Sequence, residues 1–149
     1  MEYPDTLRAG IIQFDIRSGD VSENQRRAAA ALRRLSEDGA DLAVLPELWS
    51  CGFDNARLTL HGARTPEILA SLQTLAKARR MLIAGSLPEL ADGRVYNTFY
   101  VVDRDGAVAG AYRKIHLFAQ EEKTAPIINL VRDNVTNVFM YTTALSRAR

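Results

Sequence analysis

The chain has 149 residues, of which 47% are hydrophobic and 25% are charged, an ordinary composition for a globular protein with its own core. The 19 basic and 18 acidic residues leave a formal net charge of +1, which argues against a partner such as nucleic acid or an anionic membrane surface. The single cysteine, Cys51, excludes an internal disulfide and a multi-cysteine metal site. The sequence also has no Walker A pattern and no Gly-x-Gly-x-x-Gly motif, so we expect a protein without metal or cofactor.

Targeting signals are absent from the printed sequence. The first residues lack the basic and apolar pattern of a secretory signal, and no apolar run approaches the length that spans a membrane. We expect a cytoplasmic protein that does not associate with membranes.

The first third of the chain predicts a strand, a helix and a second strand. Apolar residues within 7–14 predict the first strand, and Ser22 opens a capping box before an amphipathic helix over 23–37. Leu42 to Leu45 form a short apolar run closed by Pro46, which predicts a strand over 41–46 that is buried on both faces. Such a unit implies a parallel pair of strands with a right-handed crossover.

The middle of the chain continues the alternation of helix and strand. Residues 54–64 are expected to be irregular. Thr65 as a cap, followed by proline at the first helical position, predicts a helix that ends near Arg80. Residues 81–86 predict a third strand, closed by Leu87-Pro88-Glu89.

A predicted hairpin follows the third strand. Residues 95–102 and 107–113 read as two strands joined by a turn at 103–106. We assign residues 1–123 to one domain and treat 124–149 as a divergent tail. In that tail, runs 127–131 and 138–141 have strand character, but no cap or turn signal organises them.

Glu47 is the first candidate functional residue. It lies in the stretch Leu-Pro-Glu-Leu-Trp-Ser-Cys-Gly-Phe at 45–53, just past the carboxyl end of a predicted strand. In open α/β sheets, ligands bind at that end of the strands. A surface glutamate in an ordinary loop is the alternative, and position alone leaves it open.

A second stretch, Tyr-Arg-Lys-Ile-His-Leu-Phe at 112–118, places Lys114 at the end of another predicted strand. Together the two stretches resemble the carbon–nitrogen hydrolase family, the nitrilase superfamily of amidases and nitrilases. The resemblance runs from about Leu7 to Phe118 and fades after Glu122. It implies an α/β fold, a partial α–β–β–α sandwich of the nitrilase type, and a homo-oligomeric assembly.

The resemblance also implies roles for individual residues. In the family a cysteine attacks an amide or nitrile carbon, and water then hydrolyses the covalent intermediate. By motif, Glu47 takes the place of the general base and Lys114 that of the cation that stabilises the tetrahedral intermediate. Many members carry a second glutamate after the lysine. Glu121 or Glu122 is the nearest candidate here, and we assign Glu122 on a weak local match.

The nucleophile of the family is missing from its expected place. The family's cysteine lies on a later strand, and this sequence has no cysteine after Cys51. Cys51 lies inside the Glu47 stretch and is expected to be an inert, semi-buried residue.

His61 and His116 are too far apart in sequence to suggest a metal site. Asn97 and Tyr112 are candidates for groups that support the site, with structural strand residues as the alternative.

Three hypotheses follow for the function. First, the chain is the N-terminal half of a carbon–nitrogen hydrolase whose full-length relatives act on a small amide or nitrile. It would then be truncated or frame-shifted, and inactive alone. Second, it is a pseudoenzyme or a dimerising interaction module on the same fold. Third, it is a flavodoxin-like binding domain, against which the absence of a glycine-rich phosphate loop counts.

Overall fold

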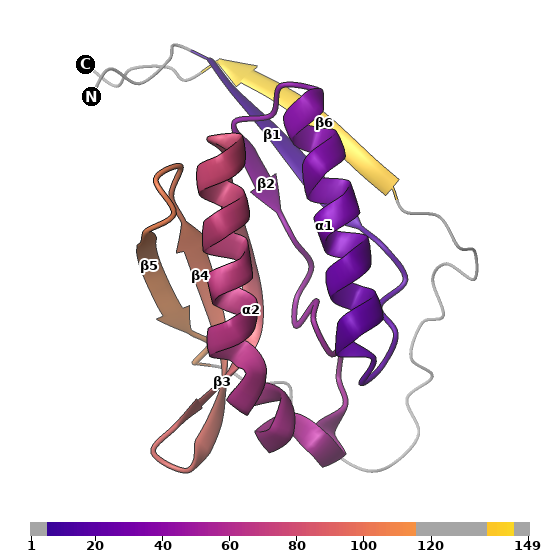
Figure 1. Cartoon of the computed structure of the whole chain (residues 1–149), viewed down its shortest axis with the longest axis vertical. Coiled ribbons are helices and arrows are strands. Elements are labelled where there is room, and N and C mark those ends of the chain that lie inside the picture. The colour runs from indigo at the N-terminus through magenta and orange to yellow at the C-terminus, as the bar shows by residue number, and fades with distance from the viewer. Residues whose placement is uncertain (1–5, 116–136, 145–149) are drawn as a thin grey trace.

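The computed structural model describes residues 6–115 and 137–144 (Figure 1). Within these ranges the chain forms one mixed sheet of six strands in the order β5-β4-β3-β2-β1-β6. The elements are β1 (Thr6–Gln13), α1 (Val21–Glu37), β2 (Leu42–Val44), a short 3-10 helix (Asn55–Arg57), α2 (Leu58–Arg79), β3 (Leu82–Ala91), β4 (Arg94–Val102), β5 (Val108–Arg113) and β6 (Asn137–Ala144).

The centre of the sheet is parallel and its flanks are antiparallel. β2 pairs in parallel with β1 and with β3, and Ala43 is the Cα partner of both Gly10 and Ile83. β3, β4 and β5 form an antiparallel meander, and β6 pairs antiparallel with β1. The predicted strand–helix–strand unit and the predicted hairpin are both confirmed.

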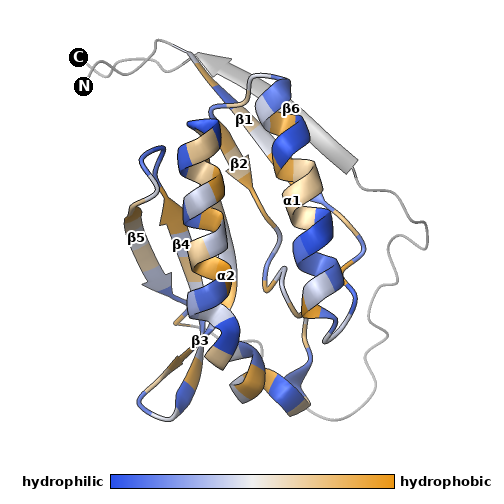
Figure 2. Cartoon of the chain, viewed as in Figure 1, coloured by the Kyte–Doolittle hydropathy of each residue, from blue (hydrophilic) through white to orange (hydrophobic). Residues whose placement is uncertain are grey.

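In the described ranges, both long helices pack on the same face of the sheet (Figure 1). The fit is close, since a Cβ atom on Gly10 of β1 would lie 2.5 Å from Cδ2 of Leu35 on α1. Leu35, Ile83 and Ala76 are fully buried in the cluster that fills this layer. Figure 2 shows hydrophilic segments along α1 and largely hydrophobic colour on β2 and β4. This layer holds the core.

The opposite face of the sheet is covered by no helix of the described residues. It carries apolar side chains that keep substantial solvent exposure, with Ile11 at 40%, Phe99 at 38% and Tyr112 at 57%. Phe99 and Tyr112 lie side by side because they are Cα partners on β4 and β5, whereas Ile11 lies on β1, beyond β3 and β2. One helix layer on one sheet is half of an α–β–β–α sandwich, so the expected partial sandwich is confirmed. We call the face of the sheet that no described helix covers the open face.

The start of α1 corrects the predicted cap. The helix begins at Val21, and Asp20 is its N-cap, with the Asp20 carboxylate accepting a hydrogen bond from the Glu23 backbone N–H at 3.1 Å. Ser22 lies inside the first turn and does not cap it. Asp20 with Glu23 is itself a capping-box spacing, and aspartate competes well with serine as a cap.

The prediction that residues 54–64 are irregular is wrong. The 3-10 helix and α2 occupy most of that range, and α2 runs through Pro66. Proline inside a helix removes one backbone hydrogen bond and bends the axis, and α2 changes direction in its first turns (Figure 1). Thr65 is therefore not a cap. Its buried hydroxyl donates instead to the carbonyl of Pro88 on β3.

β3 is longer than predicted, because it continues through Pro88 to Ala91. Lys114 N–H donates to the Asn97 carbonyl, so the backbone polar groups of Asn97 face the β5 side. Pro88, the Cα partner of Asn97, thus needs no N–H toward β4. Proline is tolerated here because β2 has already ended beside Ala84.

The tail is described in part. The strand character of 138–141 is confirmed by β6 at the edge of the sheet. The run 127–131 lies outside the described residues. The division at residue 123 into a domain and a tail stays a prediction.

Candidate functional site

Glu47 and Lys114 meet at the open face of the sheet. Lys114 Nζ lies 2.7 Å from Glu47 Oε1, and the same oxygen accepts a hydrogen bond from Asn97 Nδ2 at 2.6 Å. The two charged side chains keep 43% and 39% of their exposure, so water and a ligand can both reach them. An ion pair this exposed adds little to stability, and its importance is chemical.

The position of Glu47 follows from how β2 ends. Leu45 still donates its N–H to the Ala84 carbonyl, and Pro46 then has no N–H to continue the ladder. Leu48 has a φ of +46° and turns the chain sharply. Leu48 and Trp49 are 6% and 2% exposed, whereas Glu47 stays at the surface. The turn thus separates a buried apolar pair from an accessible carboxylate.

Lys114 directly follows the last residue of β5. Its N–H donates to the Asn97 carbonyl at 2.9 Å, which extends the pairing of β5 with β4 by one residue. Arg113, the preceding residue, is the Cα partner of Thr98, which is buried on the helix-covered face. There Arg113 binds Glu89 and lies 4.1 Å above the ring centre of Tyr96. Neighbouring residues therefore point to opposite faces, one structural and one at the site.

The loop after Glu47 is held by contacts from distant parts of the chain. Asn24 on α1 donates to the Ser50 carbonyl at 3.0 Å, and the Gly19 N–H donates to the Cys51 carbonyl at 2.8 Å. Asp54 Oδ2 lies 2.8 Å from Nε2 of His61 on α2, and both side chains are mostly buried. The hydrogen bond from His61 lowers the pKa of Asp54, and Arg57 beside it acts in the same direction. The loop is thus fixed at both ends.

Cys51 is more deeply buried than expected. Its exposure is 0%, and its Sγ lies 3.3 Å from the Gly52 carbonyl oxygen. Burial raises the pKa of the Cys51 thiol, which works against formation of the thiolate. Its position supports the prediction that it is inert.

Other predicted residues divide into those that reach the site and those that the structure does not place. Asn97 reaches Glu47 directly. Tyr112 lies on the open face at 57% exposure. Glu121, Glu122 and His116 lie outside the described residues, so the second glutamate stays a prediction.

Sequence reasoning missed Asp54 and Ser86 in the neighbourhood of the site. His61 was considered only as a metal ligand, and its partner Asp54 was not considered. Ser86, whose Oγ accepts the Leu48 N–H at 2.9 Å, was treated as an ordinary strand residue. Because side chains alternate along a strand, the sequence could have predicted that Ser86 and Ala84 share a face. It could not have predicted the turn that brings the Leu48 N–H to Ser86.

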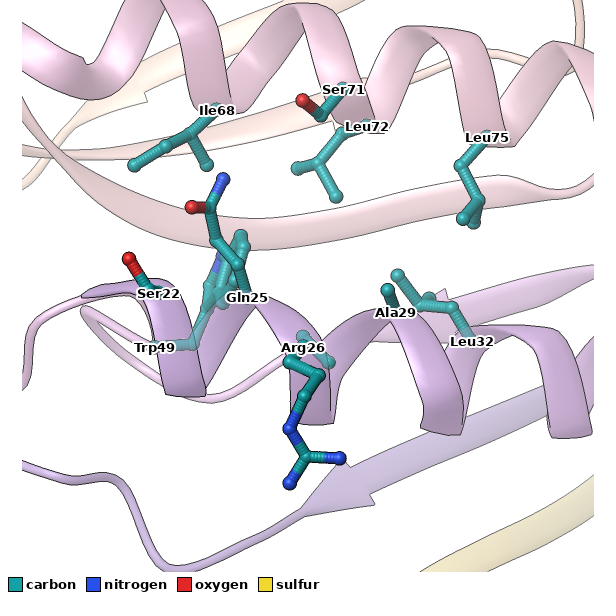
Figure 3. Close-up of a pocket in the computed structure, with 11 residues that line it drawn as sticks. Ser22, Gln25, Arg26, Ala29, Leu32, Trp49, Ile68, Ser71, Leu72 and Leu75 are labelled. Carbon is teal, nitrogen blue, oxygen red and sulfur yellow. The ribbon is translucent and has the colours of Figure 1, made fainter. Parts of the chain in front are cut away.

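A pocket of about 380 Å³ lies away from this site, between α1 and α2 (Figure 3). Apolar side chains of the two helices, including Leu32 and Leu72, face one another across it, and Trp49 also lines it. Neither Glu47 nor Lys114 lines this pocket. The candidate catalytic groups therefore lie outside this pocket.

Within residues 6–115 and 137–144, no helix is both long and apolar enough to cross a membrane. In the same part of the chain no group of three or more His, Cys, Asp or Glu side chains is arranged to hold a metal ion.

Comparison with known proteins identifies the same family over most of the chain. The family model described as carbon-nitrogen hydrolase matches residues 8–139. A 2-oxoglutaramate amidase of Bacillus subtilis (strain 168) is 38% identical over 109 residues, which cover 72% of this chain and 42% of that protein. An omega-amidase of Mus musculus is 34% identical over 115 residues, covering 76% of this chain and 41% of that protein.

Solved structures agree with these relatives. The NitN amidase from Neterenkonia sp. AN1 superimposes with a TM-score of 0.69 at 25% identity, covering 76% of this chain and 46% of that one. The chain thus spans less than half the length of the relatives that it matches. The flavodoxin-like alternative is not favoured. With the matched family model, the amidase relatives and the fold in agreement, the chain belongs to the carbon–nitrogen hydrolase family.

Proposed function

We propose that the chain carries the general base and the stabilising cation of an enzyme that hydrolyses a small amide. The observation that supports this is the convergence on one carboxylate oxygen, Glu47 Oε1, of Lys114 Nζ and Asn97 Nδ2. A base held by two donors has a defined direction, and the ammonium beside it can offset negative charge that forms on the substrate.

In the proposed reaction a cysteine thiol, supplied by the part of the enzyme that this chain does not span, adds to the amide carbon. Glu47 accepts the thiol proton as the sulfur–carbon bond forms. The carbonyl oxygen becomes negative, and the Lys114 ammonium stabilises it. The proton then passes to the amide nitrogen, the carbon–nitrogen bond breaks and ammonia leaves. Glu47 next deprotonates a water molecule, which attacks the thioester and releases the acid and the thiol.

The names of the relatives suggest the substrate class. One is a 2-oxoglutaramate amidase and another an omega-amidase, and a cysteine-to-alanine mutant of the Nesterenkonia sp. AN1 amidase was solved in complex with butyramide. We propose a short aliphatic or ω-amide as the substrate, with nitriles as the alternative. The cytoplasmic location and the homo-oligomeric assembly stay predictions.

The test measures ammonia release from a panel of short amides, ω-amides and nitriles. The 149-residue chain alone should release none above buffer, because Cys51, its one cysteine, is buried. The chain mixed with a polypeptide covering the unmatched part of the Bacillus subtilis amidase should release ammonia. Glu47→Gln should lower that rate by roughly 10⁴-fold, the upper end of what a positioned general base contributes.

Glu67→Gln, the same charge-removing change at an exposed residue of α2, is the matched control and should keep the full rate. Turnover by the chain alone that Glu47→Gln abolishes would contradict the proposal, because Cys51 or water would then be the nucleophile. A mixture that assembles but ignores Glu47→Gln would contradict the role of the base.

A further inference from the structure

The ladder between β2 and β3 is interrupted immediately before Glu47. The Leu45 N–H donates to the Ala84 carbonyl at 2.8 Å, and Pro46 has no N–H to donate. Beyond Pro46, the Leu48 N–H reaches β3 again at the Oγ of Ser86, 2.9 Å away. The Ser86 hydroxyl therefore accepts a hydrogen bond that a backbone carbonyl would accept in an uninterrupted ladder.

Leu48 adopts a backbone conformation that needs support. Its φ of +46° lies in the left-handed region, which a side chain such as leucine seldom occupies. Its carbonyl accepts the N–H groups of Cys51 at 3.1 Å and Gly52 at 2.7 Å. Those bonds hold the carbonyl side of the turn, and Ser86 holds the N–H side. Without Ser86 the buried N–H of Leu48 would lose its partner.

Ser86 is itself immobilised. It is 6% exposed in the middle of β3, and it follows Gly85, where an added Cβ would lie 3.3 Å from Cδ1 of Trp49. Its hydroxyl is therefore a fixed point on a rigid strand, and the peptide that carries Glu47 is bonded to it one residue later. Asn97 and Lys114 bind the carboxylate, whereas Ser86 fixes the backbone from which the carboxylate extends.

We propose that Ser86 is a positioning residue for Glu47: by accepting the Leu48 N–H it holds the left-handed turn that aims the carboxylate at Asn97 and Lys114. The significance for catalysis rests on the proposed function. The geometric part does not, because the Glu47–Lys114 pair can be observed without turnover.

The first experiment uses the 149-residue chain and the ¹H–¹⁵N cross peak of the Lys114 ammonium, assigned with Lys114→Arg. Wild type should show the peak because a paired ammonium exchanges slowly, and Glu47→Gln should lose it. Ser86→Ala should also lose most of it, and Ser86→Thr, which keeps the oxygen, should retain it. Ile12→Val, in the core of β1 at 1% exposure, is a destabilised control that should retain it.

A second experiment reads kinetics in the mixed enzyme. Ser86→Ala should lower kcat about 100-fold at unchanged KM, the cost of a misplacement near 1 Å, and Ser86→Thr should restore most of the loss. Absence of turnover in every mixture would refute the proposed function, whereas the ammonium peak would still decide the role of Ser86.

The role is overturned if Ser86→Ala keeps the wild-type ammonium peak, or if Ile12→Val loses it equally. Should Ser86→Ala fail to fold, Ser86→Cys, whose sulfur is a weak acceptor, replaces it against the same two controls. In that case, equal ammonium peaks in Ser86→Cys and Ser86→Thr overturn the role.

Discussion

Arg113 holds Glu89 by two parallel hydrogen bonds, from Nε to Oε2 at 2.9 Å and from Nη2 to Oε1 at 2.7 Å. The Thr98 hydroxyl adds a third at 2.6 Å. The Arg113 guanidinium, followed by Thr98, holds the pKa of Glu89 below its ordinary value of 4.5. The two parallel hydrogen bonds join β5 to β3 across β4. Arg113 directly precedes Lys114, the cation of the site.

This ion pair should make stability depend on pH. A carboxyl whose pKa is lowered by folding stabilises the protein above its unfolded pKa, and the contribution is lost as pH falls through the folded value. Arg113→Met should therefore lower the Tm at pH 7 and narrow its difference from wild type below pH 4.5. Thermal unfolding followed by circular dichroism at pH 7, 5 and 3 measures this. A difference that stays constant with pH would contradict it.

Asp54 should contribute to acid sensitivity in the same direction. The hydrogen bond from His61 is the main cause that lowers the pKa of Asp54. The stabilising effect of Asp54 should therefore be complete above pH 3.8, its ordinary pKa, and be lost as the pH falls below that value. Asp54→Asn should unfold more easily than wild type in urea at pH 6, and the two midpoints should converge as pH approaches 3. Asp105→Asn, at the β4–β5 turn, is the control and should follow wild type.

Gly85 should tolerate no side chain. A Cβ there would lie 2.8 Å from the Cβ of Leu45, an atom close to the backbone that cannot swing away. Gly85→Ala should cost about 1–3 kcal/mol by overpacking, measured by urea unfolding. Because Leu45 lies two residues before Glu47, the same variant should disturb the Lys114 ammonium signal. A stable variant with an unchanged signal would show that the loop has room to move.

Gly93 should matter for its backbone alone. It has a φ of +72° beside Asp92 at +51°, the paired positive values of a tight hairpin turn, and an added Cβ would meet nothing within 4 Å. Gly93→Ala should cost roughly 1–2 kcal/mol from the left-handed backbone. Gly110→Ala in β5, which is equally uncrowded, is the control and should be neutral or slightly stabilising. Equal costs would contradict the explanation.

The sequence was most informative where one local rule governs an element. The apolar run ending at Pro46 predicted the strand and the place where Glu47 leaves it, because proline cannot donate to a ladder. The prediction that this strand is buried on both faces is wrong, since Leu42 and Val44 are only half-buried on the open face. The turn at 103–106 likewise depends on local chemistry, and Gly106 has the positive φ it needs.

The errors arose where a tertiary contact outweighed a local signal. Pro66 follows a threonine and reads as a helix start, yet Thr65 is bonded to Pro88 and the helix begins eight residues earlier. The bond from Asn97 to Glu47 depends on the register of β4 against its neighbours, which composition does not reveal. Ser86 became important only through a turn at Leu48 that no propensity favours.

The short path from Val44 to Leu48 also determines where the protein can accept insertions and deletions. One residue added between Val44 and Glu47 would shift the carboxylate relative to the Leu48 turn that Ser86 holds, and so away from Asn97 and Lys114. The hairpin turn at Gly93 has open space around it and no such constraint. Length changes in related chains should therefore gather at the turns of the meander and leave these five positions intact.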